Sequence, residues 1–269
     1  MTLATPSVNS SKGPGLAELA APLDEELLRL RRIDLRAAMD VDLLSRVDTK
    51  LVVPVGELLA LLRRLCSQPC APYQLVVTPV GFAPRYSTIY FDTPDLRDYR
   101  AHHNGRRVRQ KFRYRRYHST DAVFFEVKQR TNARRTSKTR VAVARIPNSV
   151  GPDERSLAAD LGLEAHRLIP MLNVTYHRIT LVGDGQRVTI DVGLHCSGRN
   201  GRSADFGETP IVEIKDHRRR PDSPIAIALR DLGLRPHSVS KYCVGVASCF
   251  DGIKSNRFRP TLRRLGARR

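Results

Sequence analysis

Long apolar runs, cysteine pairs and acidic residues are all scarce in this chain. No apolar run approaches the roughly 18 residues that a membrane span needs, and the N-terminus lacks the basic, apolar and small-residue pattern of a secretory signal. The five cysteines are odd in number and form no CxxC pair, which is typical of reduced, structural thiols. These absences lead us to expect a cytoplasmic protein.

Acidic residues are outnumbered, because 27 Asp and Glu face 46 Lys and Arg, which leaves a net charge of +19. This imbalance indicates an anionic partner: a nucleic acid, an acidic membrane surface or a phosphate-rich small molecule. The sequence carries no helix-turn-helix, zinc-finger or RNA-recognition signature, so specific nucleic-acid binding is the weaker alternative. At 269 residues the chain is long enough for one domain with a substantial core.

Basic residues recur at every second position of one strand-like segment, and spacing of two places side chains on one face of a strand. The first strand carries five bases on that face: Arg107, Arg109, Lys111, Arg113 and Arg115. A second strand follows a short polar connection and carries Phe124, Glu126, Lys128 and Arg130 on one face. A solvated face of an antiparallel sheet is the ordinary interpretation. Five like charges repel one another, however, so the alternative is a face that holds a polyanion.

Alternating and β-branched or aromatic segments predict strands elsewhere in the chain. Beyond the basic hairpin, we expect strands over residues 46–53, 74–78, 86–92, 137–144, 174–181, 187–194 and 210–216. Helical spacing and start signals predict helices over residues 24–39, 55–65, 93–103, 223–232 and 240–249, with short helices within 153–168. We expect a disordered lead over residues 1–22, one domain over 23–250 and a basic tail over 251–269.

The predicted fold class is therefore α+β, with an antiparallel sheet of about eight strands and peripheral helices. Strand after strand offers one apolar face and one face with charges of both signs. A sheet of this size can close into a barrel. With the charged faces turned inward, that barrel is a tunnel rich in Arg and Lys with a few carboxylates.

Short motifs follow one another in a fixed order along the chain, with STIYFD at residues 87–92 before most of them. They are Arg113-Tyr-Arg115, Glu126-Val-Lys128, Tyr176-His-Arg178, Glu213-Ile-Lys215 and Ser240-Lys241-Tyr242. In this order the sequence resembles the VTC (vacuolar transporter chaperone) domain over about residues 44–249. That family belongs to the triphosphate tunnel metalloenzymes, together with the CYTH group.

The resemblance implies an eight-stranded antiparallel β-tunnel that transfers the γ-phosphate of ATP onto inorganic polyphosphate with Mn²⁺ or Mg²⁺. The implied catalytic bases are Arg113, Arg115, Lys128, Arg178 and Lys241. The implied substrate-binding residues are Lys50, Lys111, Lys138, Arg140, Tyr176, Lys215 and Ser240. The implied metal ligands are Glu213 and Glu126, with Asp191 as a further carboxylate. ATP and polyphosphate are the implied partners, and a separate membrane partner stays open.

Three alternatives remain from the residues. The triphosphatase branch is known for Glu-x-Glu-x-Lys on its first strand, whereas this chain has Arg46-x-Asp48-x-Lys50, which favours the polymerase-like branch over a CYTH-type triphosphatase. A non-catalytic sensor of polyphosphate or inositol phosphates has the same tunnel without turnover. Taken singly, Glu126 with Lys128 and Glu213 with Lys215 also fit surface ion pairs worth at most about 1 kcal/mol.

Overall fold

The computed structural model describes residues 14–40, 47–67, 72–132, 136–207 and 209–266. Its centre is an antiparallel path of eight strands, in the order β2-β11-β9-β8-β4-β5-β6-β7. In that order the strands are β2 (Val47–Val52), β11 (Ile211–Asp216), β9 (Gln186–Gly198), β8 (Ile169–Gly183), β4 (Arg85–Asp92), β5 (Arg109–Tyr117), β6 (Ala122–Arg130) and β7 (Thr136–Val143). Three short strands flank the path: β1 (Arg31–Asp34), β3 (Gln74–Val77) and β10 (Ser203–Asp205).

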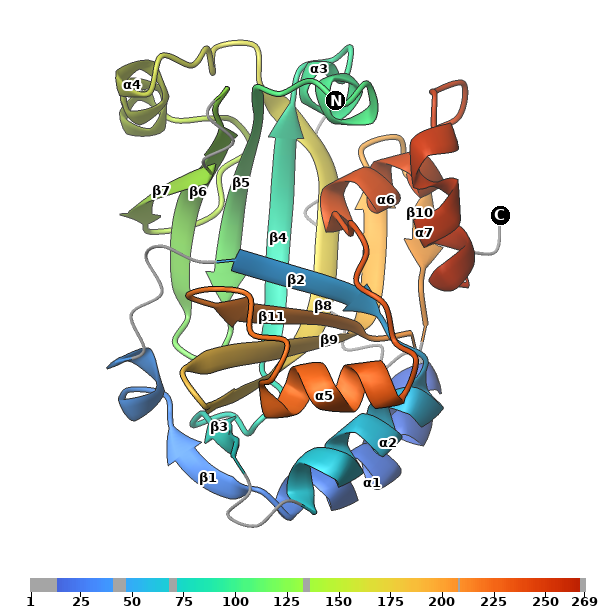
Figure 1. Ribbon diagram of the computed structural model, residues 1–269. Helices are drawn as coiled ribbons and strands as arrows, with labels where there is room; N and C mark the ends of the chain where they lie inside the picture. The colour runs from blue at the N-terminus through green and yellow to red at the C-terminus, as the bar shows by residue number, and fades with distance from the viewer. Residues whose placement is uncertain (1–13, 41–46, 68–71, 133–135, 208, 267–269) are drawn as a thin grey trace.

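The sheet is strongly curled, and Figure 1 shows β2 and β11 crossing in front of β4 and β8. Within the described ranges no pairing joins the end strands β2 and β7, so the sheet is a half-barrel. The predicted α+β fold, with eight antiparallel strands and peripheral helices, is confirmed in this form. We call the inner side of the curl the concave face.

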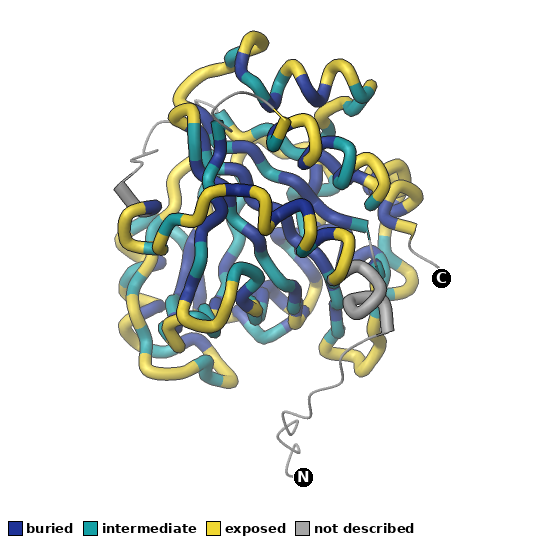
Figure 2. Tube along the Cα trace, turned by 90° about the horizontal axis from the view of Figure 1, so that it is seen from below, coloured by how far each residue is buried: buried dark blue, intermediate teal, exposed yellow. Residues whose placement is uncertain are grey.

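The described residues form seven helices around the sheet. They are α1 (Pro14–Leu28), α2 (Val55–Cys66), α3 (Arg97–His103), α4 (Pro152–Asp160), α5 (Pro224–Asp231), α6 (Lys241–Cys249) and α7 (Arg259–Arg264), with 3-10 turns η1 (Ala37–Asp40) and η2 (Asn256–Phe258). None of the described helices is long and apolar enough to cross a bilayer. Seen from below, buried strands occupy the interior and exposed residues lie mostly on the helices and loops (Figure 2).

Apolar side chains of β5, β6 and β11 pack outward. Val212 and Ile214 of β11 join a core with residues of α1, α2 and α5, and Phe112 and Phe125 join a second core with residues of α4. The intervening positions, including Glu213, therefore face the concave side, as alternation requires.

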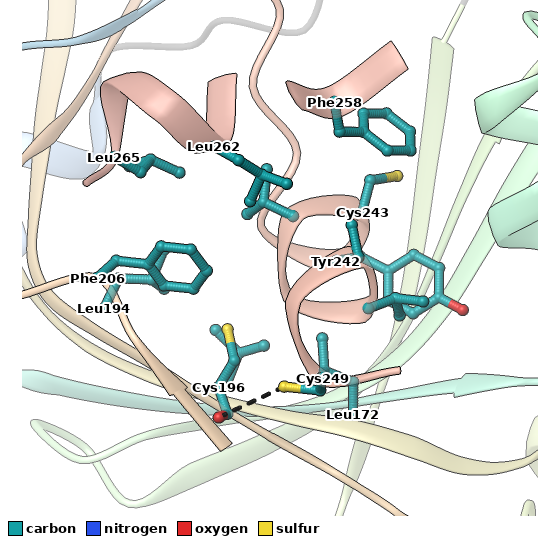
Figure 3. Packing of buried hydrophobic residues seen from close by; sticks show 14 of the residues in the cluster. Leu172, Leu194, Cys196, Phe206, Tyr242, Cys243, Cys249, Phe258, Leu262 and Leu265 are labelled. Carbon is teal, nitrogen blue, oxygen red and sulfur yellow. Dashed lines mark hydrogen bonds between the residues drawn. The ribbon is translucent and has the colours of Figure 1, made fainter. Parts of the chain in front are cut away.

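Helix α6 packs on the concave side of β8 and β9. Figure 3 shows Tyr242, Cys243 and Cys249 of α6 among Leu172, Leu194 and Cys196 of the sheet. The approach is close at Gly245, because a Cβ there would lie 2.6 Å from Leu172 Cδ2 and 2.8 Å from Cys196 Sγ. The four cysteines of the described residues are free thiols, in agreement with the expected reduced state, and Cys70 lies outside those residues.

Strand β9 contains a bulge at Gly193. The β8–β9 register shifts between Thr175 and His177, and Gly193 has φ +62°, which suits a residue without a Cβ. Because one residue is inserted, Asp191 and Leu194 face the same side despite an odd spacing.

Two predictions for the N-terminal region were wrong. The helix expected over residues 24–39 ends at Leu28, and β1 follows it, paired in parallel with β3. Ile33 packs against a small cluster with Val76 and Val182, so tertiary pairing overrides helix propensity there. Helix α1 also occupies residues 14–22, where a disordered lead was expected, while residues 1–13 lie outside the described residues.

The C-terminal region was also mispredicted as a tail. It folds into η2 and α7, and Phe258, Leu262 and Leu265 are buried in the same cluster as α6 (Figure 3). The many basic residues suggested a solvated tail. One or two large apolar side chains per turn are nevertheless enough to anchor a short helix.

Leu265→Ala is expected to lower the free energy of unfolding by about 2–5 kcal/mol, because the leucine is 1% exposed and its removal leaves a cavity. Urea denaturation followed by circular dichroism measures the change. Leu28→Ala, at a 51% exposed leucine, is the matched control and is expected to change stability by at most about 0.5 kcal/mol. Equal effects of the two substitutions would contradict a packed C-terminal segment.

Candidate functional site

Charged side chains gather on the concave face, and three inward carboxylates organise most of them. Glu126, Asp191 and Glu213 come from β6, β9 and β11 and are 1%, 0% and 15% exposed at their side chains. Each is held by at least two bases, so the face consists of three ion-pair groups with further cations between them.

The first group surrounds Glu126. Arg113 lies directly opposite it in the β5–β6 register, and Arg113 Nε donates to Glu126 Oε2 at 2.6 Å. Lys138 Nζ lies 2.5 Å from Oε1, and Arg115 approaches Oε2 at 4.0 Å. Burial alone would raise the pKa of Glu126, but these three cations hold it well below its usual range. The carboxylate therefore stays ionised and fixes the two guanidinium groups.

The second group surrounds Asp191 and joins the sheet to α6. Arg178 makes a bidentate contact with it, at 2.6 Å from Nε to Oδ1 and 2.8 Å from Nη2 to Oδ2. Lys241 Nζ, at the start of α6, donates to Oδ2. Although burial opposes ionisation, Arg178 and Lys241 hold the pKa of Asp191 well below its usual range. Asp191 of the bulged strand β9 thus positions Arg178 and Lys241, which belong to separate sequence motifs.

The third group surrounds Glu213. Lys50 of β2 lies directly opposite it in the register, with Nζ 2.5 Å from Oε1, and Lys215 Nζ lies 2.7 Å from Oε2. Against the effect of burial, these lysines keep the pKa of Glu213 low. Glu213 is the most accessible of the three carboxylates.

Three further cations have no carboxylate at ion-pair distance among the described residues: Lys111, Lys128 and Arg140. Lys111 Nζ donates to Ser240 Oγ at 2.8 Å, and Arg140 lies over the Phe124 ring at 4.7 Å. Enclosure by the curled sheet, then repulsion from Lys50 and Lys111, lowers the pKa of Lys128 to about 8. A neighbouring anion would relieve this repulsion.

Tyrosines complete the wall beside Arg178. Tyr176 stacks on Tyr86 with ring centroids 5.4 Å apart, and Lys241 Nζ lies 4.7 Å from the Tyr176 ring centre. The Tyr176 hydroxyl is buried and has no hydrogen-bond partner among the described residues. It is therefore an unpaired donor buried in the wall of the concave face. Tyr90 OH, in contrast, already accepts from Arg113 at 3.2 Å.

The donor set limits what metal site the chain can form. No group of three His, Cys, Asp or Glu side chains with metal-ligand spacing exists in the described part of the chain. Glu126 and Glu213 belong to separate ion-pair groups rather than to one carboxylate pair. The residues fit a hard cation only where phosphate oxygens and water supply most of its ligands, which is the usual situation for Mg²⁺.

All the predicted site residues lie on or at the edge of the concave face, and their catalytic roles stay predictions. Sequence reasoning treated Asp191 as a secondary carboxylate, although it is the partner of two predicted bases, and it missed Tyr86 and Tyr90. Tyr86 and Tyr90 lie four residues apart on one face of β4, and this even spacing is the sequence signal that points to the concave face. Ser240 also caps α6, since its Oγ accepts from Cys243 N at 3.3 Å.

Glu126→Gln is expected to lower the free energy of unfolding by about 3 kcal/mol, because buried cations lose their counter-charge. Pyrophosphate is expected to raise the melting temperature of this variant more than that of the wild type, since it replaces the lost charge. Differential scanning fluorimetry with and without pyrophosphate measures both effects. Glu164→Gln, at a 73% exposed side chain, is the control. A variant that pyrophosphate stabilises no more than it does the wild type would argue against an anion site beside Glu126.

Comparisons with known proteins agree with the motifs. No curated protein matches the chain. Solved structures that resemble it include a putative adenylyl cyclase from Hippeastrum described as having a dominant triphosphatase activity, at 14% identity, 77% of this chain, 98% of that chain and TM-score 0.47. A putative adenylate cyclase from Bacillus halodurans has 14% identity, coverages of 73% and 94% and TM-score 0.45. These likenesses say nothing about substrate. The VTC domain model matches residues 45–250. The chain therefore belongs to the VTC domain family.

Proposed function

We propose that the protein is a polyphosphate polymerase-like phosphotransferase, which moves the γ-phosphate of ATP onto a growing polyphosphate chain on the concave face. One observation carries the proposal, namely the excess of cations there. Ten predicted bases share the face with four carboxylates, which are Glu126, Asp191, Glu213 and Asp48. This surplus of positive charge matches a ligand with several negative charges. Alternation of polar and apolar residues alone would not produce such a surplus.

Phosphoryl transfer needs a protein mainly to align donor and acceptor and to stabilise charge on the phosphoryl oxygens. Arg113 and Arg178 are held rigidly by carboxylates, so their remaining guanidinium hydrogens are directed before a ligand arrives. Lys111 and Lys128 supply point charges, and the Tyr176 hydroxyl supplies a neutral donor. Fixed donors of this kind cost little reorganisation during reaction.

A divalent cation, Mn²⁺ or Mg²⁺, would supply positive charge that offsets the charge developing on the phosphoryl group. Of the two predicted ligands, Glu213 suits this role better, because its side chain is 15% exposed whereas that of Glu126 is 1% exposed. Glu213 is also held by lysines alone, which can move aside more easily than a guanidinium pair. We assign Glu126 to positioning Arg113 and Arg115.

A CYTH-type triphosphatase is the second candidate, and a non-catalytic phosphate sensor is the third. Asp48 is the only carboxylate of β2, where the triphosphatase pattern has two, and this favours transfer to phosphate over hydrolysis. Nucleic-acid binding is weaker, since carboxylates interleaved among the bases would repel an extended phosphodiester backbone.

The deciding experiment incubates the protein with ATP and Mn²⁺ and follows ADP, free phosphate and acid-resistant polymer. ADP with polymer is expected, and Lys128→Ala and Glu213→Gln are each expected to lower the rate by about 10- to 100-fold. Lys128 has no carboxylate partner among the described residues, so its loss should not unfold the protein. Arg31→Ala on β1, outside the concave face, is the control.

Other results of this assay would lead to different conclusions about the function. Free phosphate without polymer would assign the protein to the triphosphatases. Bound polyphosphate without turnover would make it a sensor. Activity that survives both substitutions would refute the assigned site.

Phosphate affinity is expected to fall as the pH rises from 7 to 9. Burial is the largest cause that lowers the pKa of Lys128, Lys138 and Lys215 from 10.5 to about 8, so their charge is lost in this range. The folded state binds fewer of these protons than the unfolded state between pH 8 and 10.5, so their contribution to stability rises with pH. Weaker binding would therefore not reflect unfolding by these groups.

Calorimetric titration with tripolyphosphate at pH 7, 8 and 9 and constant ionic strength checks this dependence. Lys128→Arg keeps its charge throughout and is expected to flatten the profile. An affinity that stays constant across this range would contradict titrating lysines at the site.

A further inference from the structure

A fourth group of cations lies at the end of the concave face beside α3. Arg109 and Arg130 are direct partners in the β5–β6 register, two residues beyond the Lys111 and Lys128 pair. By alternation they share the face of those lysines. Figure 1 shows this end of β5 and β6 close to α3.

The C-terminal segment adds Arg257 to this end. Arg257 Nη1 donates to His103 O at 3.3 Å, and it occupies the space where a Cβ of Gly105 would stand, at 2.5 Å. Burial, followed by the charges of Arg130 and Arg257, lowers the pKa of Arg109. Arg109 therefore lies within the field of both Arg130 and Arg257.

His102 of α3 lies beside this group. Burial and then the charges of Lys111, Arg109, Arg257 and Arg130 lower its pKa to about 2, so the ring is neutral. Its Nδ1 lies 3.1 Å from Cys243 Sγ on α6. His102 therefore adds no charge of its own to the group.

This group differs from the other three in having no carboxylate. In the described part of the chain, no Asp or Glu forms an ion pair with Arg109, Arg130 or Arg257. Like charges placed opposite one another in a sheet destabilise it unless an anion lies between them. Guanidinium groups bind oxyanions with paired hydrogen bonds, so phosphate is the chemistry that fits.

We propose that Arg109, Arg130 and Arg257 form an accessory site for the part of a phosphate chain that extends beyond Lys111 and Lys128. The inference rests on the proposed function and deepens it, because it separates ligands by length. Two residues along a strand span roughly 7 Å, so a chain bound at Lys111 reaches Arg109 without leaving the face. Arg257 lies beyond residues 45–250, so this chain's own C-terminal segment completes the site.

The test compares binding of long-chain polyphosphate and of tripolyphosphate, both without metal, to the wild type, Arg257→Gln and Arg109→Gln. Each substitution is expected to weaken long-chain binding about tenfold, as the loss of a charged hydrogen bond does, and to change tripolyphosphate binding by less than about twofold. The slope of log K against log salt for the long chain is expected to flatten by roughly 0.7 per lost contact, as for a single-stranded polyanion.

Arg264→Gln, in the same C-terminal segment, is the matched control and is expected to bind both ligands like the wild type, because among the described residues Arg264 donates only to Pro260 O. Long-chain binding unchanged in both variants, or an equal loss for both ligands, would overturn the inference. Melting temperatures without ligand check folding, and Arg109→Gln decides the question if Arg257→Gln is unfolded. Binding does not require turnover, so a protein that makes no polymer yet shows the expected length dependence would refute the proposed function and leave this site standing.

Discussion

The contact of Asp191 with Arg178 and Lys241 is the interaction on which the concave face depends. A fully buried carboxylate is costly unless it is paired and hydrogen-bonded, and here one aspartate accepts from two elements at once. It thereby fixes α6 against β8 and β9. Two further features serve the same docking: Gly245 permits close approach, and the Tyr242 hydroxyl donates to the buried Asp92. Asp92 in turn accepts backbone N–H groups from the start of α3, so α3 and α6 are both anchored to this one carboxylate.

Carboxylates on this face have a double effect. Each removes the repulsion that would otherwise separate its bases, and each leaves those bases oriented with hydrogens to spare. If the sheet carried the cations alone, mutual repulsion would spread them or lower their charge, and at Lys128 the charges of Lys50 and Lys111 add to desolvation in lowering the pKa. With one carboxylate for every base, no charge would be left for a ligand. The observed ratio lies between these limits and combines a stable fold with a strong positive field.

Alternation along the strands made the face predictable, since a residue's parity decides which side of the sheet it occupies. The partners were not predictable. Lys50 and Glu213 are 163 positions apart, and only the antiparallel register of β2 and β11 brings them together. The bulge at Gly193 changes parity within β9, which sequence spacing alone does not reveal. The helix expected over residues 24–39 failed for a similar reason, because pairing with β3 outweighed local propensity.

The C-terminal segment shows why a family boundary is not a structural boundary. The family match ends at residue 250, yet Leu262 and Leu265 pack into the cluster that holds α6, beside Phe206 and Leu194. Because α6 carries Ser240 and Lys241, apolar contacts made beyond residue 250 support the position of cations inside the concave face. The same segment brings Arg257 to the end of β5 and β6. The segment beyond residue 250 therefore contributes both apolar packing against α6 and a cation that contacts α3.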